Sequence, residues 1–393
     1  MKIFIVNDFH PSELQGAATI AHNYHKALNN SIDSRFYCGS QKSFVTEQNN
    51  EFFLGLNFSE DATRIRVFKK LNKYLSKSLA TSRLLLAVLS SRPDVVWFHQ
   101  IGHRFGYFTI ILVKLLRVNT VLTFHDFGGI KKGKLYPRDL SLSDDAVDGW
   151  INHNLRCDLS KSQMSSVKFA TNFLGYFSRR RFRRIYIRAV SQYFVDELLY
   201  ISKLQKTIYC LFGFKSGLVV PNPIEPCKCN FVEDANDGKI KSILFAGRAI
   251  GKGLEKIAQA VSITDFKLHL AGKTELLTRA LIYLPPEQII YHGEVSRNDL
   301  FLIIHKVNMV CVPSICFDVY PTITIESLSH GTPVLTHQTC GGIDLFPSGS
   351  VYLQPYDHPI DLAKISFPKI EKFTSNDISD VIVQFKLMFQ EIK

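Results

Sequence analysis

The most constraining feature of this sequence is a repeated alternation of short apolar runs, loops and amphipathic helical segments. Residues 3–6 form an apolar run, a loop follows, and apolar side chains then recur at helical spacing over residues 17–28. Strand, loop and helix in this order open a doubly wound parallel fold. The alternation continues to about residue 220 and starts again at residue 240. The sequence therefore predicts an α/β protein with two consecutive Rossmann-like domains.

The expected elements fall into two sets. In the first set we expect further strands at 95–98, 120–124 and 218–220, and helices at 62–92 and 106–116. In the second set we expect strands at 243–246, 267–270, 289–291, 309–312 and 334–336, and helices at 254–261, 298–305 and 322–329. A stretch with Pro, Asn, Asp and Gly but no periodicity separates the sets. We predict domains at 1–224 and 240–372, a linker at 225–239, and a C-terminal helix at 373–393 that packs back toward the first domain.

The most informative segment is 313–333, PSICFDVYPTITIESLSHGTP, which passes from a strand end into a helix. Pro321 suits the first turn of that helix. Backbone N–H groups at a helix start favour a phosphate, and here they belong to Thr322, Ile323 and Thr324. Asp318 precedes the helix and Glu326 lies in its second turn, where carboxylates accept hydrogen bonds from sugar and ribose hydroxyls. The alternative is that Asp318 only caps the helix and Glu326 faces solvent.

A second loop, 245–253, follows a strand and opens a helix. It contains three glycines and two cations, Arg248 and Lys252. Glycines permit a close approach of the backbone, and the two cations suit the diphosphate that leaves a sugar nucleotide. The alternative is a solvated pair of surface cations.

Two loops of the first set carry weaker signals. Gly16 and Ala17 offer N–H groups at a helix start. His125 follows the strand at 120–124 in the run Thr-Phe-His-Asp, where it is suited to a polar contact with a ligand. The alternative for the loop that contains His125 is a simple turn with Asp126 as a helix cap.

These segments together carry a resemblance to a known family. Asp318-x7-Glu326, followed by SLSHGTPV, resembles the E-x7-E signature of retaining GT-B glycosyltransferases, family 4 in the usual classification. The sequence departs from it with Asp318 in place of a glutamate. Residues 247–253 resemble the family's G-R…K-G loop with a slightly shorter spacing, and 292–295 resemble its nucleobase loop. The run at 15–18 lacks one glycine and the acid that the family has there.

The resemblance implies a GT-B fold, with two facing Rossmann-like domains and a cleft between them. It implies transfer of a hexose from a nucleoside diphosphate sugar to a hydroxyl, with retention at the anomeric carbon. The implied catalytic residues are His125, Arg248, Lys252 and Asp318. The implied donor-binding residues are Gly16, Ala17, Gly247, Val295, Tyr320, Pro321, Thr322, Ile323 and Glu326. Relatives commonly glycosylate lipid-linked acceptors, so the expected acceptor is a polyprenyl-linked oligosaccharide of surface polysaccharide assembly.

The net charge of +12 is concentrated in two segments, 62–92 and 161–188, each with eight Lys or Arg and no acid. Apolar side chains are interspersed with the cations, as in helices that lie on an anionic membrane surface. The expected membrane-facing cations are Lys69, Lys70, Lys73, Arg179, Arg180, Arg181, Arg183 and Arg184. The alternatives are an ordinary solvated helix face and a nucleic-acid site, although no nucleic-acid module accompanies the charge.

Other features limit the function classes. The eight cysteines contain no C-x-x-C pair, which disfavours a zinc site and favours reduced thiols. No apolar window is long enough for a membrane span, and the first residues lack a signal-peptide core. No D-x-D motif follows a predicted strand, so we expect no metal and no cofactor. The predicted location is cytoplasmic, peripheral on the inner face of the plasma membrane. A non-catalytic sugar-nucleotide-binding protein and a GT-B sugar-nucleotide epimerase remain as alternatives.

Overall fold

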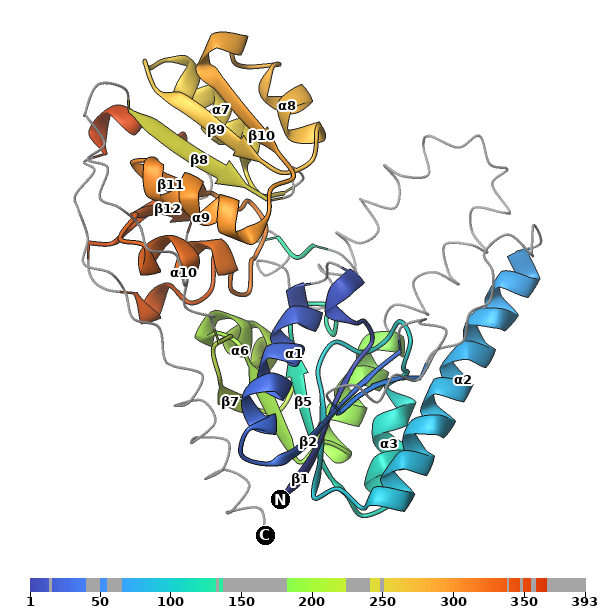
Figure 1. Cartoon of the computed structure of the whole chain (residues 1–393). Coiled ribbons are helices and arrows are strands. Elements are labelled where there is room, and N and C mark those ends of the chain that lie inside the picture. Colours follow the sequence, from blue (N-terminus) through green and yellow to red (C-terminus); the bar gives the residue numbers. More distant parts are fainter. Residues whose placement is uncertain are drawn as a thin grey trace, which may run out of the picture. The chain divides into compact units, whose positions relative to one another are not determined.

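The computed structural model describes residues 1–13, 16–39, 50–54, 66–131, 134–136, 182–223, 241–247, 251–337, 339–346, 349–354 and 358–365. These residues divide into two compact units (Figure 1). The described residues up to 131 and those from 182 to 223 form the first unit. Residues 134–136 and the described residues from 241 to 365 form the second unit. The predicted linker at 225–239 and the C-terminal helix at 373–393 lie outside the described residues.

The first unit is built on a seven-stranded sheet with the order β3-β2-β1-β4-β5-β6-β7. Every pair of neighbouring strands in it is parallel. The strands are β1 (Lys2–Asn7), β2 (Asp33–Cys38), β3 (Glu51–Phe53), β4 (Val95–Phe98), β5 (Asn119–Phe124), β6 (Glu197–Tyr200) and β7 (Leu218–Val219). The α-helices are α1 (Gly16–Asn29), α2 (Arg66–Ser91), α3 (Phe108–Leu115) and α6 (Lys203–Leu211), with a short 3-10 helix η1 (Pro11–Glu13). Residues 182–193 are also helical.

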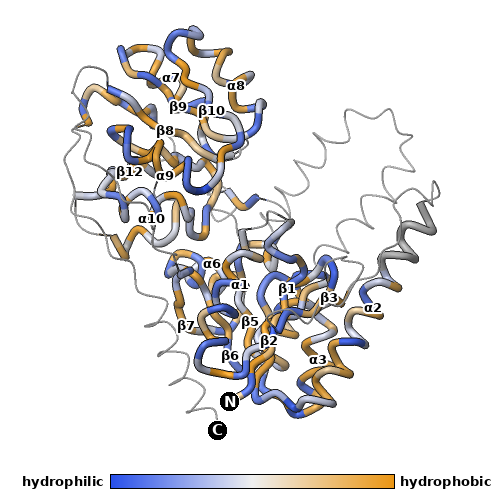
Figure 2. Tube along the Cα trace, viewed as in Figure 1, coloured by the Kyte–Doolittle hydropathy of each residue, from blue (hydrophilic) through white to orange (hydrophobic). Residues whose placement is uncertain are grey.

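Burial explains why these segments form strands and helices. β4 is buried at every position, as expected of a strand covered on both faces of a parallel sheet. On α1 the predicted apolar face is confirmed, since Ile20, Tyr24 and Leu28 are buried. On α2, Leu84 and Val88 are buried, whereas Tyr74, Leu75, Leu86 and Leu89 remain exposed. Figure 2 shows the resulting alternation of hydrophobic and hydrophilic stretches along α2.

The second unit is built on a six-stranded parallel sheet with the order β10-β9-β8-β11-β12-β13. The strands are β8 (Ser242–Ala246), β9 (Lys267–Ala271), β10 (Ile289–Gly293), β11 (Met309–Val312), β12 (Val334–His337) and β13 (Val351–Gln354). The α-helices are α7 (Leu254–Ser262), α8 (Glu275–Ala280), α9 (Arg297–Lys306) and α10 (Thr322–Ser329). Short 3-10 helices are η5 (Pro286–Gln288), η6 (Ile343–Leu345) and η7 (Leu362–Lys364). Two clusters of buried apolar side chains form its core, one including Ile257 and Leu268, the other Val310 and Leu328.

Both sheets reverse their strand order at one place, between β1 and β4 in the first unit and between β8 and β11 in the second. Ligands of such sheets bind outside the carboxyl ends of the strands at this topological switch point. The loops that follow these four strands are therefore where a site is expected in each unit.

Candidate functional site

The loop after β8 is a glycine turn that only glycine can form without strain. Gly251 and Gly253 have φ values of +75° and +81°, in the left-handed region, and Gly253 is the N-cap residue of α7. A Cβ on Gly253 would overlap the carbonyl oxygen of Pro313 in the loop after β11. Two hydrogen bonds tie the loops together, since the backbone N–H of Ile315 and the thiol of Cys316 both donate to the Gly251 carbonyl. The two loops at the switch point therefore form one packed assembly.

Lys252 and Asp318 meet within this assembly. The Lys252 ammonium donates to Oδ2 of Asp318, and the Ser314 hydroxyl contacts the same oxygen at 3.4 Å. The Asp318 side chain is only 11% exposed, while that of Lys252 is 30% exposed. Burial alone would lower the pKa of Lys252, but the charge of Asp318 and their hydrogen bond outweigh it and raise the pKa. Lys252 is therefore a cation held by a carboxylate at a position that solvent still reaches.

The start of α10 follows Asp318 along the same loop. Its N-cap residue is Pro321, whose side chain makes no capping hydrogen bond. The N–H of Thr324 donates to the Pro321 carbonyl, so the expectation of three available N–H groups is wrong for Thr324. The N–H groups of Thr322 and Ile323 belong to the first turn, where helical partners are missing. Thr322 is exposed and Ile323 is half-buried, so this turn can present N–H groups to an anion.

Glu326, in the second turn of α10, does not face solvent. Its residue exposure is 8%, and its carboxylate forms an ion pair of 3.2 Å with Arg297, the first residue of α9. Burial raises the pKa of Glu326, and the charge and hydrogen bond of Arg297 oppose this only in part. Arg297 is not predictable from the sequence, because no spacing along the chain connects α9 to α10.

The loop after β10 contains Val295, which is half-buried and packs against the second core cluster. On β10 itself, His292 Nε2 lies 3.0 Å from Nδ1 of His269 on β9, and the two rings share one hydrogen bond.

The other predicted donor-binding residues lie in different loops of this unit. Gly247, after β8, has a φ of +121° and donates its N–H to the carbonyl of Ala271 at the end of β9. Tyr320 is buried beside Gly342, where a Cβ would overlap its ring. Arg248 lies outside the described residues.

In the first unit Asp8, which follows β1, connects the two loops at the switch point. The Asp8 carboxylate is fully buried and accepts hydrogen bonds from the backbone N–H groups of His103, Arg104 and Phe105, after β4. Burial raises its pKa to about 6, although these three N–H groups and the charge of Lys77 lower it. This carboxylate is committed to holding the loop and is not exposed to a ligand.

His125 lies next to His99 at the ends of β5 and β4. His125 Nε2 and His99 Nδ1 are 2.9 Å apart, and the rings stack. Burial lowers the pKa of His125 to about 4, and burial together with the neighbouring His125 lowers the pKa of His99 well below its ordinary value. Both imidazoles are therefore neutral at pH 7, and one donates to the other. Asp126 forms an Asx turn by accepting from the N–H of Gly128, at 2.7 Å.

Gly16 and Ala17 begin α1, as the sequence predicts. Gly16 is exposed, and a Cβ at this position would meet no atom within 4 Å. Gly16 is therefore not required by the local packing, unlike Gly253.

The predicted membrane-facing cations are only partly described. Lys69, Lys70 and Lys73 lie on α2, but their side chains are outside the description, as are Arg179, Arg180 and Arg181 entirely. Arg183 donates to the Gly128 carbonyl, and Arg184 lies over the Phe212 ring at 5.6 Å. Phe182 and Ile185, on the same helix, are 71% and 45% exposed. Within the described ranges, no helix combines the length and apolar character needed to cross a bilayer.

Comparison with known proteins bears directly on the second unit. Residues 230–364 match the family described as "Glycosyl transferases group 1". The matched residues all lie in the second unit. They contain the Lys252–Asp318 pair, the start of α10 and the Arg297–Glu326 pair. No curated protein sequence matches the chain.

Solved structures match the whole chain in fold. Sucrose-phosphate synthase from Thermosynechococcus elongatus has a TM-score of 0.70 at 13% identity, covering 100% of this chain and 99% of that one. HepE from Anabaena, in complex with UDP and glucose, has a TM-score of 0.63 at 12% identity, with 100% of both chains covered. The lipopolysaccharide outer core galactosyltransferase WaaB has a TM-score of 0.57 at 14% identity, covering 91% of this chain and 87% of that one. The chain therefore has the GT-B glycosyltransferase fold, and the predicted fold class is confirmed.

Proposed function

We propose that the chain transfers a hexose from a nucleoside diphosphate sugar to a hydroxyl group, with retention at the anomeric carbon. The observation that carries the proposal is Lys252, a partly exposed cation held by Asp318 on the loop that leads into the start of α10. This arrangement lies within the residues that match the glycosyltransferase family, at the switch point of their sheet. A cation and helix N–H groups together suit a diphosphate.

In the proposed reaction the diphosphate is the leaving group, and its negative charge grows as the glycosidic bond breaks. Lys252 and the N–H groups of Thr322 and Ile323 stabilise that charge, and Arg248 is proposed to do the same. Asp318 orients Lys252. Glu326, oriented by Arg297, accepts hydrogen bonds from ribose or sugar hydroxyls.

The remaining donor contacts are proposed from the family resemblance. Gly16 and Ala17 approach the donor phosphate with their N–H groups, and His125 borders the donor sugar as a neutral imidazole. Gly247 allows close approach of the diphosphate, Tyr320 and Pro321 shape the start of α10, and Val295 lies in the loop that meets the nucleobase. No metal takes part in the proposed reaction. HepE from Anabaena binds UDP and UDP-glucose, which supports UDP as the first nucleotide to test.

The acceptor is proposed to be a lipid-linked oligosaccharide of surface polysaccharide assembly, at the inner face of the plasma membrane. The exposed Phe182 and Ile185 beside a run of arginines support membrane contact, as does the basic helix α2. The galactosyltransferase WaaB acts in the lipopolysaccharide outer core, which supports a polysaccharide acceptor.

The direct test of the enzyme proposal is a calorimetric titration of the purified chain with UDP, GDP, ADP and dTDP, followed by donor turnover with the matching sugar nucleotides. One nucleotide is expected to bind, and its sugar donor is expected to be consumed. NMR should show that the transferred sugar keeps the anomeric configuration that it had in the donor. Binding of none of them would overturn the proposal. Isomerisation of the donor without transfer would instead support the epimerase, and binding without turnover the non-catalytic protein.

Membrane contact is tested by flotation with vesicles that contain or lack an anionic lipid. Flotation is expected to require the anionic lipid and to fall when the five arginines between 179 and 184 are changed to Gln, and separately in Phe182→Ser. The control Lys273→Gln removes an exposed cation of the second unit and should float like the wild type. Flotation that ignores both lipid charge and these changes would contradict the proposal.

A further inference from the structure

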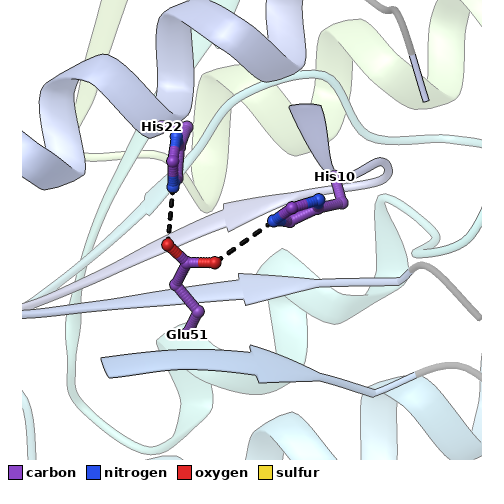
Figure 3. A group of neighbouring side chains, drawn as sticks. All are labelled: His10, His22 and Glu51. Carbon is purple, nitrogen blue, oxygen red and sulfur yellow. Dashed lines mark hydrogen bonds and ion pairs between the residues drawn. The ribbon is translucent and has the colours of Figure 1, made fainter. Parts of the chain in front are cut away.

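Three side chains from separate elements of the first unit converge on one point (Figure 3). His10 follows β1, His22 lies on α1, and Glu51 is the first residue of β3. His22 Nε2 lies 2.7 Å from Glu51 Oε1, and His10 Nε2 lies 3.2 Å from Glu51 Oε2. One nitrogen or oxygen atom of each side chain falls within 4.8 Å of the others.

The parallel sheet explains this convergence. Ile5 of β1, Phe36 of β2 and Glu51 of β3 are neighbours across the sheet, so Glu51 lies close to the chain that leads from β1 into α1. The His22 ring lies 5.4 Å from the Phe36 ring, and the His10 ring lies 4.9 Å from the Phe53 ring, measured between centroids. These aromatic neighbours limit the orientations of both imidazoles.

The three side chains are mostly buried but remain in part accessible to solvent. The three side chains are 13%, 12% and 16% exposed, for His10, His22 and Glu51 respectively. An ion can reach the cluster, while most competing water is excluded.

The set of donor atoms is one that a divalent transition metal prefers. Two imidazole nitrogens and one carboxylate oxygen form a common three-ligand zinc set, which leaves a fourth position for water. Bond lengths of about 2.0–2.2 Å place tetrahedral ligand atoms about 3.3–3.5 Å apart. The 2.7 Å and 3.2 Å contacts run to different oxygens of Glu51, and one donor atom of each side chain lies within 4.8 Å of the others. Rotation of the Glu51 carboxylate and of the imidazoles therefore brings the three donor atoms to the separation that zinc requires.

The other ring nitrogen of His10 has a partner that suits metal binding. His10 Nδ1 lies 2.8 Å from the hydroxyl of Ser12, and the backbone N–H of Ser12 donates to the same nitrogen at 3.3 Å. Ligating histidines usually donate this second N–H to an oxygen, which fixes the ring and its tautomer. With a metal on Nε2 the ring proton lies on Nδ1, which then donates to the Ser12 hydroxyl and no longer accepts from the Ser12 N–H.

We propose that His10, His22 and Glu51 bind one zinc ion, with water as the fourth ligand. The ion joins the segment after β1 and the middle of α1 to β3. It thereby fixes both sides of the loop that leads to Gly16. The inference rests on the first unit alone and does not depend on the proposed transferase activity.

The test is a zinc titration of the full chain, stripped with a chelator and kept reduced, in competition with a coloured zinc indicator. One zinc per chain is expected to bind. Glu51→Gln and His22→Gln each remove a ligand and are expected to weaken zinc binding by more than 100-fold. Ser12→Ala removes the hydrogen-bond partner of His10 and is expected to weaken zinc binding by about 10–100-fold. The control His358→Gln removes an exposed imidazole of the second unit and should bind zinc like the wild type.

Cobalt substitution separates this site from the cysteines. Cobalt bound by nitrogen and oxygen gives visible bands without the intense ultraviolet band of thiolate ligands, and both Glu51→Gln and His22→Gln should abolish those bands. Circular dichroism in chelator shows whether each variant folds, and a folded variant is required for the comparison. Failure of the folded wild-type chain to take up zinc, or thiolate-type cobalt spectra unchanged in the variants, would overturn the proposal.

Discussion

The two units reverse their strand order in the same way, yet they hold the loops at that point by opposite means. In the first unit Asp8 is fully buried and accepts from three backbone N–H groups of the opposite loop. In the second unit Asp318 contacts Lys252 of the opposite loop, and Lys252 keeps 30% of its side chain exposed. Each unit thus uses an aspartate to join the loops of its switch point.

The difference teaches where an anion can bind. Where backbone N–H groups donate to a carboxylate, they are not available to an anionic ligand, because the backbone cannot be redirected without unfolding the loop. A carboxylate satisfied by a lysine leaves a flexible cation that can turn toward an incoming diphosphate. The second unit is therefore the expected donor site, and the aspartate of the first unit is expected to act on stability.

The largest expected effect follows from removing the cation. Lys252→Met should reduce donor turnover by about 100- to 1,000-fold, as loss of a group aimed at developing charge does in other enzymes. Steady-state rates at saturating donor measure this. The matched control Lys273→Met removes an exposed lysine of the same unit and should keep wild-type turnover. Equal rates in Lys252→Met and wild type would remove the distinction between the units.

The next effect concerns the glycine turn that carries Lys252. Gly253→Ala should lower the free energy of unfolding by about 2–4 kcal/mol, because it combines a left-handed backbone with overlap against Pro313. Urea unfolding followed by tryptophan fluorescence and circular dichroism measures the change. An unfolding curve that matches the wild type would show that the turn is not held as described.

The next effect is the pH dependence of the stability that Asp8 contributes to the first unit. Its pKa is raised to about 6 in the folded chain from an ordinary 3.8, so its stabilising contribution is complete below about pH 4 and is lost as the pH rises through 6. Asp8→Asn lacks this titration and should therefore cost more stability at pH 4.5 than at pH 7, by roughly 1–2 kcal/mol. The difference between wild-type and variant unfolding free energies at the two pH values cancels the titration of all other groups. An equal cost at both pH values contradicts the burial of Asp8.

The smallest expected effect is that of Gly16→Ala. Since the added Cβ meets no atom within 4 Å, the free energy of unfolding should change by less than about 0.5 kcal/mol. If the N–H groups at this helix start approach the donor phosphate, the donor KM should still rise, by up to about tenfold. An unchanged KM together with unchanged stability would remove Gly16 from the donor site.

The sequence predicted the local parts of this site and missed the long-range ones. The helix predicted at 322–329 is α10 with the same bounds, because Pro321 and Gly331 mark both ends of an apolar segment. β2 was not predicted, since its residues Asp33–Cys38 mix polar and apolar side chains without a strong run. The Arg297–Glu326 pair and the His10–His22–Glu51 cluster join residues far apart in the chain. Only the packing of separate elements brings such residues together, so no spacing rule reveals them.

The central claim is that the second unit holds a nucleoside diphosphate between Lys252 and the start of α10. A crystal structure of the chain with bound UDP tests it most directly. We predict diphosphate oxygens within hydrogen-bonding distance of the Lys252 ammonium and of the N–H groups of Thr322 and Ile323. A diphosphate bound elsewhere, with Lys252 still turned to Asp318 and the start of α10 facing water, would contradict the claim.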